Sequence, residues 1–168
     1  THTSGVSYGN GPASDLWEAA GIQGWYFADR DDPVGDTIAR VAGRPFDAHP
    51  GEQWIYGYNT DILGALIEAV TGQSPDEFLG THVLGPLDMV DTHFYLPPAK
   101  RDRLATVYSA VDGGLERAPE PGNMVGQGAY ADGPRKSFSG GAGLLSTATD
   151  YARFLQMMLN GGELEGTR

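Results

Sequence analysis

The first residues with a recognisable chemical pattern form a serine motif near the start of the chain. Residues 5–9, GVSYG, match G-x-S-x-G, in which the serine hydroxyl attacks an acyl group. That motif works on a sharp turn between a strand and a helix, because the turn lifts the hydroxyl clear of the backbone. No strand pattern precedes Ser7, and Asn-Gly-Pro stands where the helix would begin. We therefore interpret Ser7 as a loop residue.

Metal and phosphate sites find no support in the sequence. The four histidines stand at positions 2, 49, 82 and 93, and no H-E-x-x-H occurs. The acidic stretch 29–32 lacks the glycine and the distal glutamate of a calcium loop. The chain has no cysteine, and no Gly-Lys-Ser/Thr follows the glycines of residues 140–143. We expect neither a metal nor a cofactor.

Three segments indicate a different chemistry. The central one, residues 50–72, reads PGEQWIYGYNTDILGALIEAVTG, while residues 1–5 read THTSG and residues 140–155 read GGAGLLSTATDYARFL. In content and order they resemble segments of the serine β-lactamase-like and penicillin-binding-protein-like hydrolases, a family that includes class C β-lactamases, D-Ala-D-Ala carboxypeptidases and related carboxylesterases. In that family a Pro-Gly turn leads to an aromatic residue, then to Tyr-x-Asn or a variant, and a helix ending in Thr/Ser-Gly follows.

The resemblance implies that Tyr56 is the catalytic tyrosine. A phenol titrates at about 10, so it serves as a base at neutral pH only where positive charge favours the phenolate. Nearby lysines supply that charge in the family, and the positive end of the helix that follows Tyr56 would add to it. In this role Tyr56 would accept the serine proton during acylation or activate water during deacylation.

Two family motifs are missing from the chain. Neither Lys100 nor Lys136 has a serine three residues before it, so the nucleophile motif Ser-x-x-Lys is absent. The third motif, Lys/His-Thr/Ser-Gly, is absent too. In the family both motifs lie outside the region that these residues cover. We therefore expect an internal fragment that supplies the tyrosine but not the nucleophile, and that is inactive alone.

The residue two positions after Tyr56 also departs from the family pattern. Tyr58 stands where the family has an asparagine that binds an amide of the substrate. Asn59 comes one position later, and we expect it to cap a helix that begins at Thr60. The replacement favours ester hydrolysis over β-lactam hydrolysis. Aromatic residues are candidates to line an acyl or leaving-group pocket: Trp25, Tyr26, Trp54 and Tyr58.

Helices dominate the expected secondary structure. Hydrophobic spacing and capping residues predict helices over residues 14–20, 32–43, 60–71, from 74 onward, and 148–160. Ser74 and Glu77 form a capping box. A strand over residues 104–111 turns back into residues 115–118, and residues 119–143 read as loop. No βαβ alternation occurs, which excludes a doubly wound sheet. We expect residues 1–168 to be one α+β region, the mainly helical portion of a β-lactamase/transpeptidase-like fold with long loops and a short β-hairpin.

Charge and hydropathy exclude two classes of partner. The net charge is −11, from 22 acidic and 11 basic residues, so no basic face for nucleic acid is expected. No apolar run approaches the ~20 residues of a membrane span. The 25 glycines and 11 prolines indicate long, shaped loops.

These observations favour the central segment of a serine hydrolase that cleaves an ester, an amide or a β-lactam through an acyl-enzyme. A carboxylesterase is favoured over a β-lactamase or a D-Ala-D-Ala carboxypeptidase. Its expected partners are a small ester or amide substrate and the remainder of the hydrolase domain. The alternative is a non-catalytic module, for substrate sensing or interaction, on the same scaffold. A Ser-x-x-Lys some tens of residues upstream would decide for the enzyme.

Overall fold

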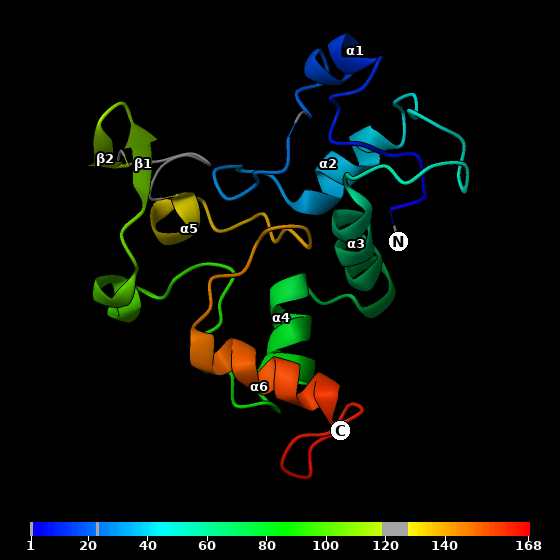
Figure 1. The fold of residues 1–168 in the computed structure, drawn as a ribbon. Helices are drawn as coiled ribbons and strands as arrows, with labels where there is room; N and C mark the ends of the chain where they lie inside the picture. The colour runs from blue at the N-terminus through cyan, green and yellow to red at the C-terminus, as the bar shows by residue number, and fades with distance from the viewer. Residues whose placement is uncertain (1, 23, 119–127) are drawn as a thin grey trace.

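A computed structural model describes residues 2–22, 24–118 and 128–168 (Figure 1). Its helices are α1 (Ser14–Glu18), α2 (Val34–Val41), α3 (Asn59–Thr71), α4 (Pro75–Leu79), α5 (Ala129–Asp132) and α6 (Ala148–Leu159). A π-helical turn over Gly80–Leu84 extends α4, and a 3-10 helix spans Pro98–Arg103. The strands are β1 (Tyr108–Val111) and β2 (Gly114–Arg117). The α+β expectation, mainly helical with one hairpin, is confirmed.

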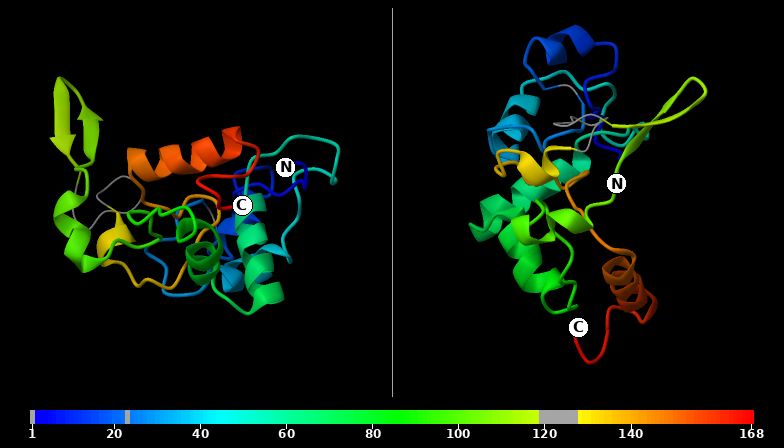
Figure 2. Two further views of the ribbon diagram at one scale, coloured as in Figure 1. Left: turned by 90° about the horizontal axis from the view of Figure 1, so that it is seen from below. Right: turned by 90° about the vertical axis from the view of Figure 1, so that its left-hand side faces the viewer.

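The hairpin is shorter than its sequence pattern predicts. β1 and β2 pair antiparallel, with Tyr108 opposite Arg117 and Val111 opposite Gly114. The strand begins at Tyr108 and not at residue 104, because the preceding residues close the 3-10 helix and Leu104 is its C-cap. In both views of Figure 2 the hairpin projects away from the helices. It therefore contributes little to the environment of the central helix.

Helix α3 forms the centre of the helical part, in contact with α2 and α4. It ends at Gly72, whose φ of 71° is the left-handed conformation that glycine adopts without strain. The expected capping box opens α4, since the Ser74 side chain accepts from Glu77 N–H and Glu77 reaches back. The predicted cap at Asn59 is wrong. Tyr58 occupies the N-cap position without a side-chain cap bond, and Asn59 is the first helical residue.

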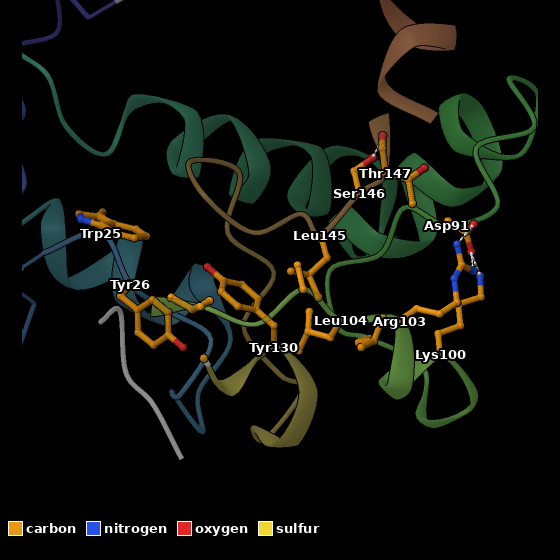
Figure 3. A pocket seen from close by; sticks show the side chains of 14 residues that line it. Trp25, Tyr26, Asp91, Lys100, Arg103, Leu104, Tyr130, Leu145, Ser146 and Thr147 are labelled. Atoms are coloured by element: carbon orange, nitrogen blue, oxygen red, sulfur yellow. Dashed lines mark hydrogen bonds and ion pairs between the residues drawn. The ribbon is translucent and has the colours of Figure 1, made fainter. Parts of the chain in front are cut away.

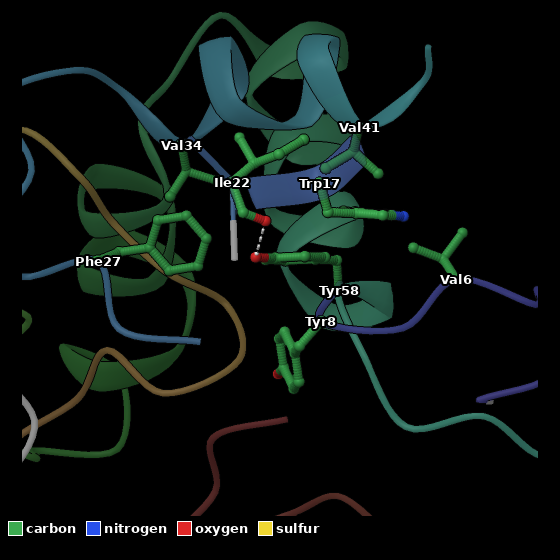
Figure 4. Close-up of a cluster of buried hydrophobic side chains, with 8 residues drawn as sticks. All are labelled: Val6, Tyr8, Trp17, Ile22, Phe27, Val34, Val41 and Tyr58. Carbon is green, nitrogen blue, oxygen red and sulfur yellow. Dashed lines mark hydrogen bonds between the residues drawn. The ribbon is translucent and has the colours of Figure 1, made fainter. Parts of the chain in front are cut away.

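The main hydrophobic cluster forms around Tyr58, between α1, α2 and α3 (Figure 4). Tyr58 is fully buried, stacked on Trp17 with ring centroids 6.0 Å apart. Its hydroxyl donates to the carbonyls of Ile22 and Gly24, at 2.8 and 2.5 Å. A buried phenol normally finds such a partner for its polar end. Tyr58 therefore holds the chain that leads into Trp25, besides filling the core.

A second, smaller cluster is built on Ala28, Phe94 and Tyr95. The Tyr95 hydroxyl donates to the carbonyl of Ser137 at 2.7 Å. Outside both clusters, α3 and α6 each keep apolar side chains on their surface, among them Leu66, Val70 and Leu159. Exposed apolar surface on two helices is typical of a face that another part of the protein covers.

Candidate active site

The first two motif segments lie side by side. The backbone N–H of Ile55 donates to the carbonyl of His2 at 2.7 Å, and that of Gly51 donates to Thr3, also at 2.7 Å. The approach is close at Gly57, where any side chain would collide with the carbonyl of Val6. These contacts join the THTSG segment to the stretch that carries Tyr56.

The third segment packs on the first turn of α3. The Ser139 hydroxyl donates to Asp61 Oδ1 at 2.6 Å, and the Gly141 N–H donates to the same oxygen at 3.2 Å. A side chain at Gly140 would collide with the carbonyl of Thr60, so only glycine allows this approach. The three segments that carry the resemblance thus meet at the start of α3.

Tyr56 lies at this meeting point, with 55% of its surface exposed. Its ring contacts His2 and Tyr8, with centroids 4.6 and 5.6 Å away, and stacks on Trp54 at 5.9 Å. The Asn59 amide donates to His2 Nδ1 at 3.1 Å, which holds the imidazole beside Tyr56. Among the described residues, none hydrogen-bonds the Tyr56 hydroxyl. The phenol is therefore held by contacts of its ring.

The other aromatic residues singled out in the sequence do not all join Tyr56. Trp54 lies beside it and is 69% exposed. Tyr58 points into the core, and no part of its side chain is free to meet a substrate. Trp25 packs edge-on against Tyr26, which packs against Tyr130. The structure thus separates the expected pocket residues into one beside Tyr56, one in the core and one group elsewhere.

Trp25 and Tyr26 line a pocket of about 440 Å³ (Figure 3). Leu96, Leu104 and Tyr130 add to its apolar wall. At the opposite end, Asp91 pairs with Lys100 and Arg103, with N···O distances of 2.8 and 2.7 Å. Hydrogen bonds from Arg103 and then Lys100 hold the pKa of Asp91 well below its usual range. The pocket is an apolar cavity with a paired charge cluster at one end.

Ser7 is confirmed as a loop residue. It is buried, neither strand nor helix flanks it directly, and its hydroxyl accepts from the backbone N–H of Gly9 at 3.1 Å. Such a hydroxyl is turned into the loop and is not presented to a substrate.

Two buried residues with polar groups near the start of α3 were missed from sequence. Asp61 is 1% exposed, and burial raises the pKa of its carboxyl. Burial, the charge of Asp61 and the phenol of Tyr56 raise the pKa of Tyr8 to about 12. A signal for Asp61 existed, since it stands three residues before Gly64 on the buried side of α3, where an apolar residue is usual. Tyr8 carried no comparable signal.

Within residues 2–22, 24–118 and 128–168, no three His, Cys, Asp or Glu side chains are grouped to hold a metal ion. Across the same residues, no helix has the length and apolar character to cross a membrane.

Known proteins are similar to this chain over its whole length. Residues 1–168 match the family model described as Beta-lactamase. Lovastatin esterase of Penicillium rubens is 30% identical over 167 residues, which cover 95% of this chain and 38% of the esterase. Esterase EstB of Burkholderia gladioli is 33% identical over 174 residues, covering 93% of this chain and 42% of EstB. The structure of EstCE1, a hydrolase with promiscuous acyltransferase activity, matches with a TM-score of 0.79 and 25% identity, over 99% of this chain and 46% of EstCE1.

The chain spans less than half the length of these relatives. The resemblance found in the three segments is confirmed by a match that extends over every residue. The TM-score shows that EstCE1 shares the fold of this chain. The chain belongs to the β-lactamase family.

Proposed function

We propose that this chain is the central part of a serine hydrolase that cleaves carboxylic esters through an acyl-enzyme, with Tyr56 as its general base. The observation that carries the proposal is the position of Tyr56, which is exposed, contacts His2 of the first segment, and precedes by a few residues the turn of α3 on which the third segment packs. The two esterases among the relatives support hydrolysis of an ester. The nucleophile would come from a Ser-x-x-Lys segment outside these 168 residues.

In this mechanism Tyr56 moves one proton in each half of the reaction. The phenolate takes the proton of the serine hydroxyl as the serine oxygen attacks the ester carbonyl, and the phenol then protonates the departing alcohol. In the second half Tyr56 takes a proton from water, whose oxygen attacks the acyl-enzyme, and the serine leaves with that proton. An exposed phenol whose ring contacts His2, Tyr8 and Trp54, and whose hydroxyl bonds no described residue, suits both steps.

The inward position of Tyr58 supports an ester over a β-lactam. An asparagine that grips a substrate amide must present its side chain to the substrate, whereas Tyr58 lies in the core. Trp54 would contact the substrate near the reacting carbonyl, because its ring stacks on that of Tyr56. The Trp25 pocket would take a larger apolar part of the substrate, because aromatic and aliphatic side chains line it.

The remainder of the hydrolase domain is the proposed covering of α3 and α6. Both helices expose several large apolar side chains, a surface that an isolated soluble domain rarely keeps. Residues 1–168 would then form one internal piece of a single hydrolase domain.

The test uses the hydrolase that contains this chain together with its Ser-x-x-Lys segment. A fluorophosphonate labels only an activated serine, so it reports the nucleophile directly, and a nitrophenyl ester reports turnover. Tyr56→Phe is expected to lower both the labelling rate and kcat, by roughly 10²- to 10⁴-fold for a general base. Tyr108→Phe on β1 is the matched control, because Tyr108 is 57% exposed, Tyr56 is 55% exposed, and the hairpin lies outside the faces of α3 and α6.

Three outcomes would contradict the proposal. Labelling and turnover that survive Tyr56→Phe would remove the general-base role. Equal losses in Tyr56→Phe and Tyr108→Phe would point to a surface effect. A protein that binds esters but shows neither labelling nor turnover would be the non-catalytic module.

A further inference from the structure

The first turn of α3 contains a carboxylate that the proposed chemistry does not use. Asp61 is 1% exposed, and its Oδ1 accepts from Ser139 and from Gly141. Its second oxygen, Oδ2, is buried and has no hydrogen-bond partner among the described residues. Buried carboxylate oxygens are almost always paired, because an unpaired one has lost its hydration without compensation. We therefore expect a hydrogen-bond donor close to Asp61 Oδ2.

Tyr8 places a hydroxyl next to this oxygen. A Cβ atom built on Gly141 would lie 2.7 Å from Asp61 Oδ2 and 3.1 Å from the Tyr8 hydroxyl, so the two groups border the same small space. Glycine leaves that space free, and any larger residue would enter it. Burial, together with the charge of Asp61, raises the pKa of Tyr8 to about 12. At neutral pH Tyr8 is thus a phenol with its proton in place, the form that donates to a carboxylate.

Tyr8 also contacts the proposed base. Its ring meets that of Tyr56 at an interplanar angle of 73°, with centroids 5.6 Å apart. On its other side it meets the buried Tyr58 at 78° and 4.7 Å. Tyr8 thus stands between a phenol fixed in the core and a phenol exposed to substrate. Any change in the tilt of Tyr8 is passed to Tyr56 through this edge-on contact.

We propose that Asp61 and Tyr8 form a positioning pair for Tyr56, in which a small shift of the Tyr8 hydroxyl across the space between the two groups lets it donate to Asp61 Oδ2, and the ring thus held fixes the orientation of the Tyr56 ring. The inference rests on the proposed function, since it gives Tyr56 the role of base. In this proposal Asp61 not only joins α3 to the loop at Gly141 but also holds the Tyr8 ring. Without the bond, Tyr56 spends less time in the orientation that accepts the serine proton. Substrate contacts elsewhere are unchanged, so kcat falls while KM is retained.

The experiment is a double-mutant cycle in the hydrolase that contains this chain. Tyr8→Phe keeps the ring and removes the donor, and Asp61→Asn keeps the Oδ1 acceptor and removes the charge. We expect each to lower kcat on a nitrophenyl ester by roughly 10- to 100-fold, as misorientation of a reacting group does. KM should stay within about twofold. The double variant should fall no further than the worse single one, because both changes break the same bond.

Gly141→Ala tests the pair without touching either member. Its methyl group would enter the space between the Tyr8 hydroxyl and Asp61 Oδ2, so it should reproduce the loss of kcat. Gly64→Ala is the matched control, because a Cβ there meets no atom closer than 3.8 Å. Tyr95→Phe controls for loss of a buried hydroxyl, since Tyr95 bonds to Ser137 in the other cluster.

A titration of Tyr8 tests whether its hydroxyl and Asp61 are close together. With carbon-13-labelled tyrosine, NMR should give a Tyr8 pKa of about 12, and Asp61→Asn should lower it because a charge that raises it is gone. An unchanged Tyr8 pKa in Asp61→Asn would contradict the pair, while kcat at unchanged KM separates positioning from packing. If Asp61→Asn fails to fold, Tyr8→Phe combined with Gly141→Ala completes the cycle in its place.

Wild-type kcat in Tyr8→Phe, or losses that add in the double variant, would overturn the positioning pair. The proposed function fails separately. If Tyr56→Phe abolishes turnover while Tyr8→Phe does not, only the pair is refuted. If Tyr56→Phe itself is fully active, the base assignment is refuted, and the pair with it.

Discussion

Tyr56 and Tyr58 stand two residues apart, and removing one oxygen from each should have opposite effects. The Tyr58 hydroxyl has a single hydrogen, which it shares between the carbonyls of Ile22 and Gly24. Tyr58→Phe leaves both carbonyls in the core without that donor. An unsatisfied buried group costs about 1–3 kcal/mol, and we expect the free energy of unfolding to fall by about that amount.

The catalytic consequences should run the other way. Tyr58→Phe leaves the Tyr56 ring and its contacts in place, so kcat on a short-chain ester should fall by less than about tenfold, below the range for loss of a general base. Tyr56→Phe removes an exposed oxygen that no described residue bonds, so the free energy of unfolding should change by less than about 0.5 kcal/mol. Urea denaturation and steady-state kinetics on the two variants of the hydrolase give all four values.

One pattern of results would refute this reasoning. If Tyr58→Phe is the crippled enzyme and Tyr56→Phe is near wild type, the register of the family motif is wrong by two residues. The motif tyrosine would then be Tyr58, with Asn59 beside it, and the argument for an ester from the missing asparagine would fall. Loss of stability in both variants would instead mean that Tyr56 is a structural residue.

Three further outcomes are expected of the 168-residue chain by itself. It should not hydrolyse a nitrophenyl ester, and turnover abolished by Ser7→Ala would restore Ser7 as a nucleophile. It should associate or bind a hydrophobic dye through the exposed faces of α3 and α6, whereas a monomer melting cooperatively above ~65 °C would contradict this. Its stability should decline as pH rises from about 10 toward 12, because folded Tyr8 keeps its proton up to about 12 while the unfolded phenol releases it near ~10. Urea midpoints at both pH values should show the decline, and Tyr8→Phe should reduce it.

Local patterns predicted the elements well where local physics decides them. Helices α3 and α6 follow from hydrophobic spacing, and α4 from its capping box. Asn59 shows the limit of such patterns. Asparagine is a favoured helix cap. The Asn59 amide instead donates to His2, which lies 57 residues away in the sequence. Capping preferences cannot anticipate a partner that only the fold brings close.

The site was predicted in part, and for a similar reason. Three segments pointed to Tyr56, and the structure brings those segments together. The sequence has several aromatic residues near Tyr56, but it does not show which of them are buried and which are exposed. Tyr58 was expected in a pocket wall, yet it turns inward because Gly57 lets the chain pass against residues 6 and 7. Asp61 and Tyr8 escaped notice because only the fold brings both of them to Gly141, which lies 80 residues beyond Asp61 and still further from Tyr8.

The alternation along residues 54–58 has a consequence for how such a hydrolase could diversify. Trp54 and Tyr56 lie on the surface, whereas Tyr58 is buried. Within these five positions, some side chains can therefore be substituted with little effect on stability, while Tyr58 cannot. In the hydrolase proposed above, substitutions at Trp54 would alter the surface beside Tyr56 with little effect on the fold, since Trp54 is 69% exposed. Tyr58 has no such freedom, because its ring and its hydroxyl are both committed to the interior. In the proposed hydrolase, selection for a new substrate would therefore change Trp54 and retain Tyr58, whose packing keeps the segment in place.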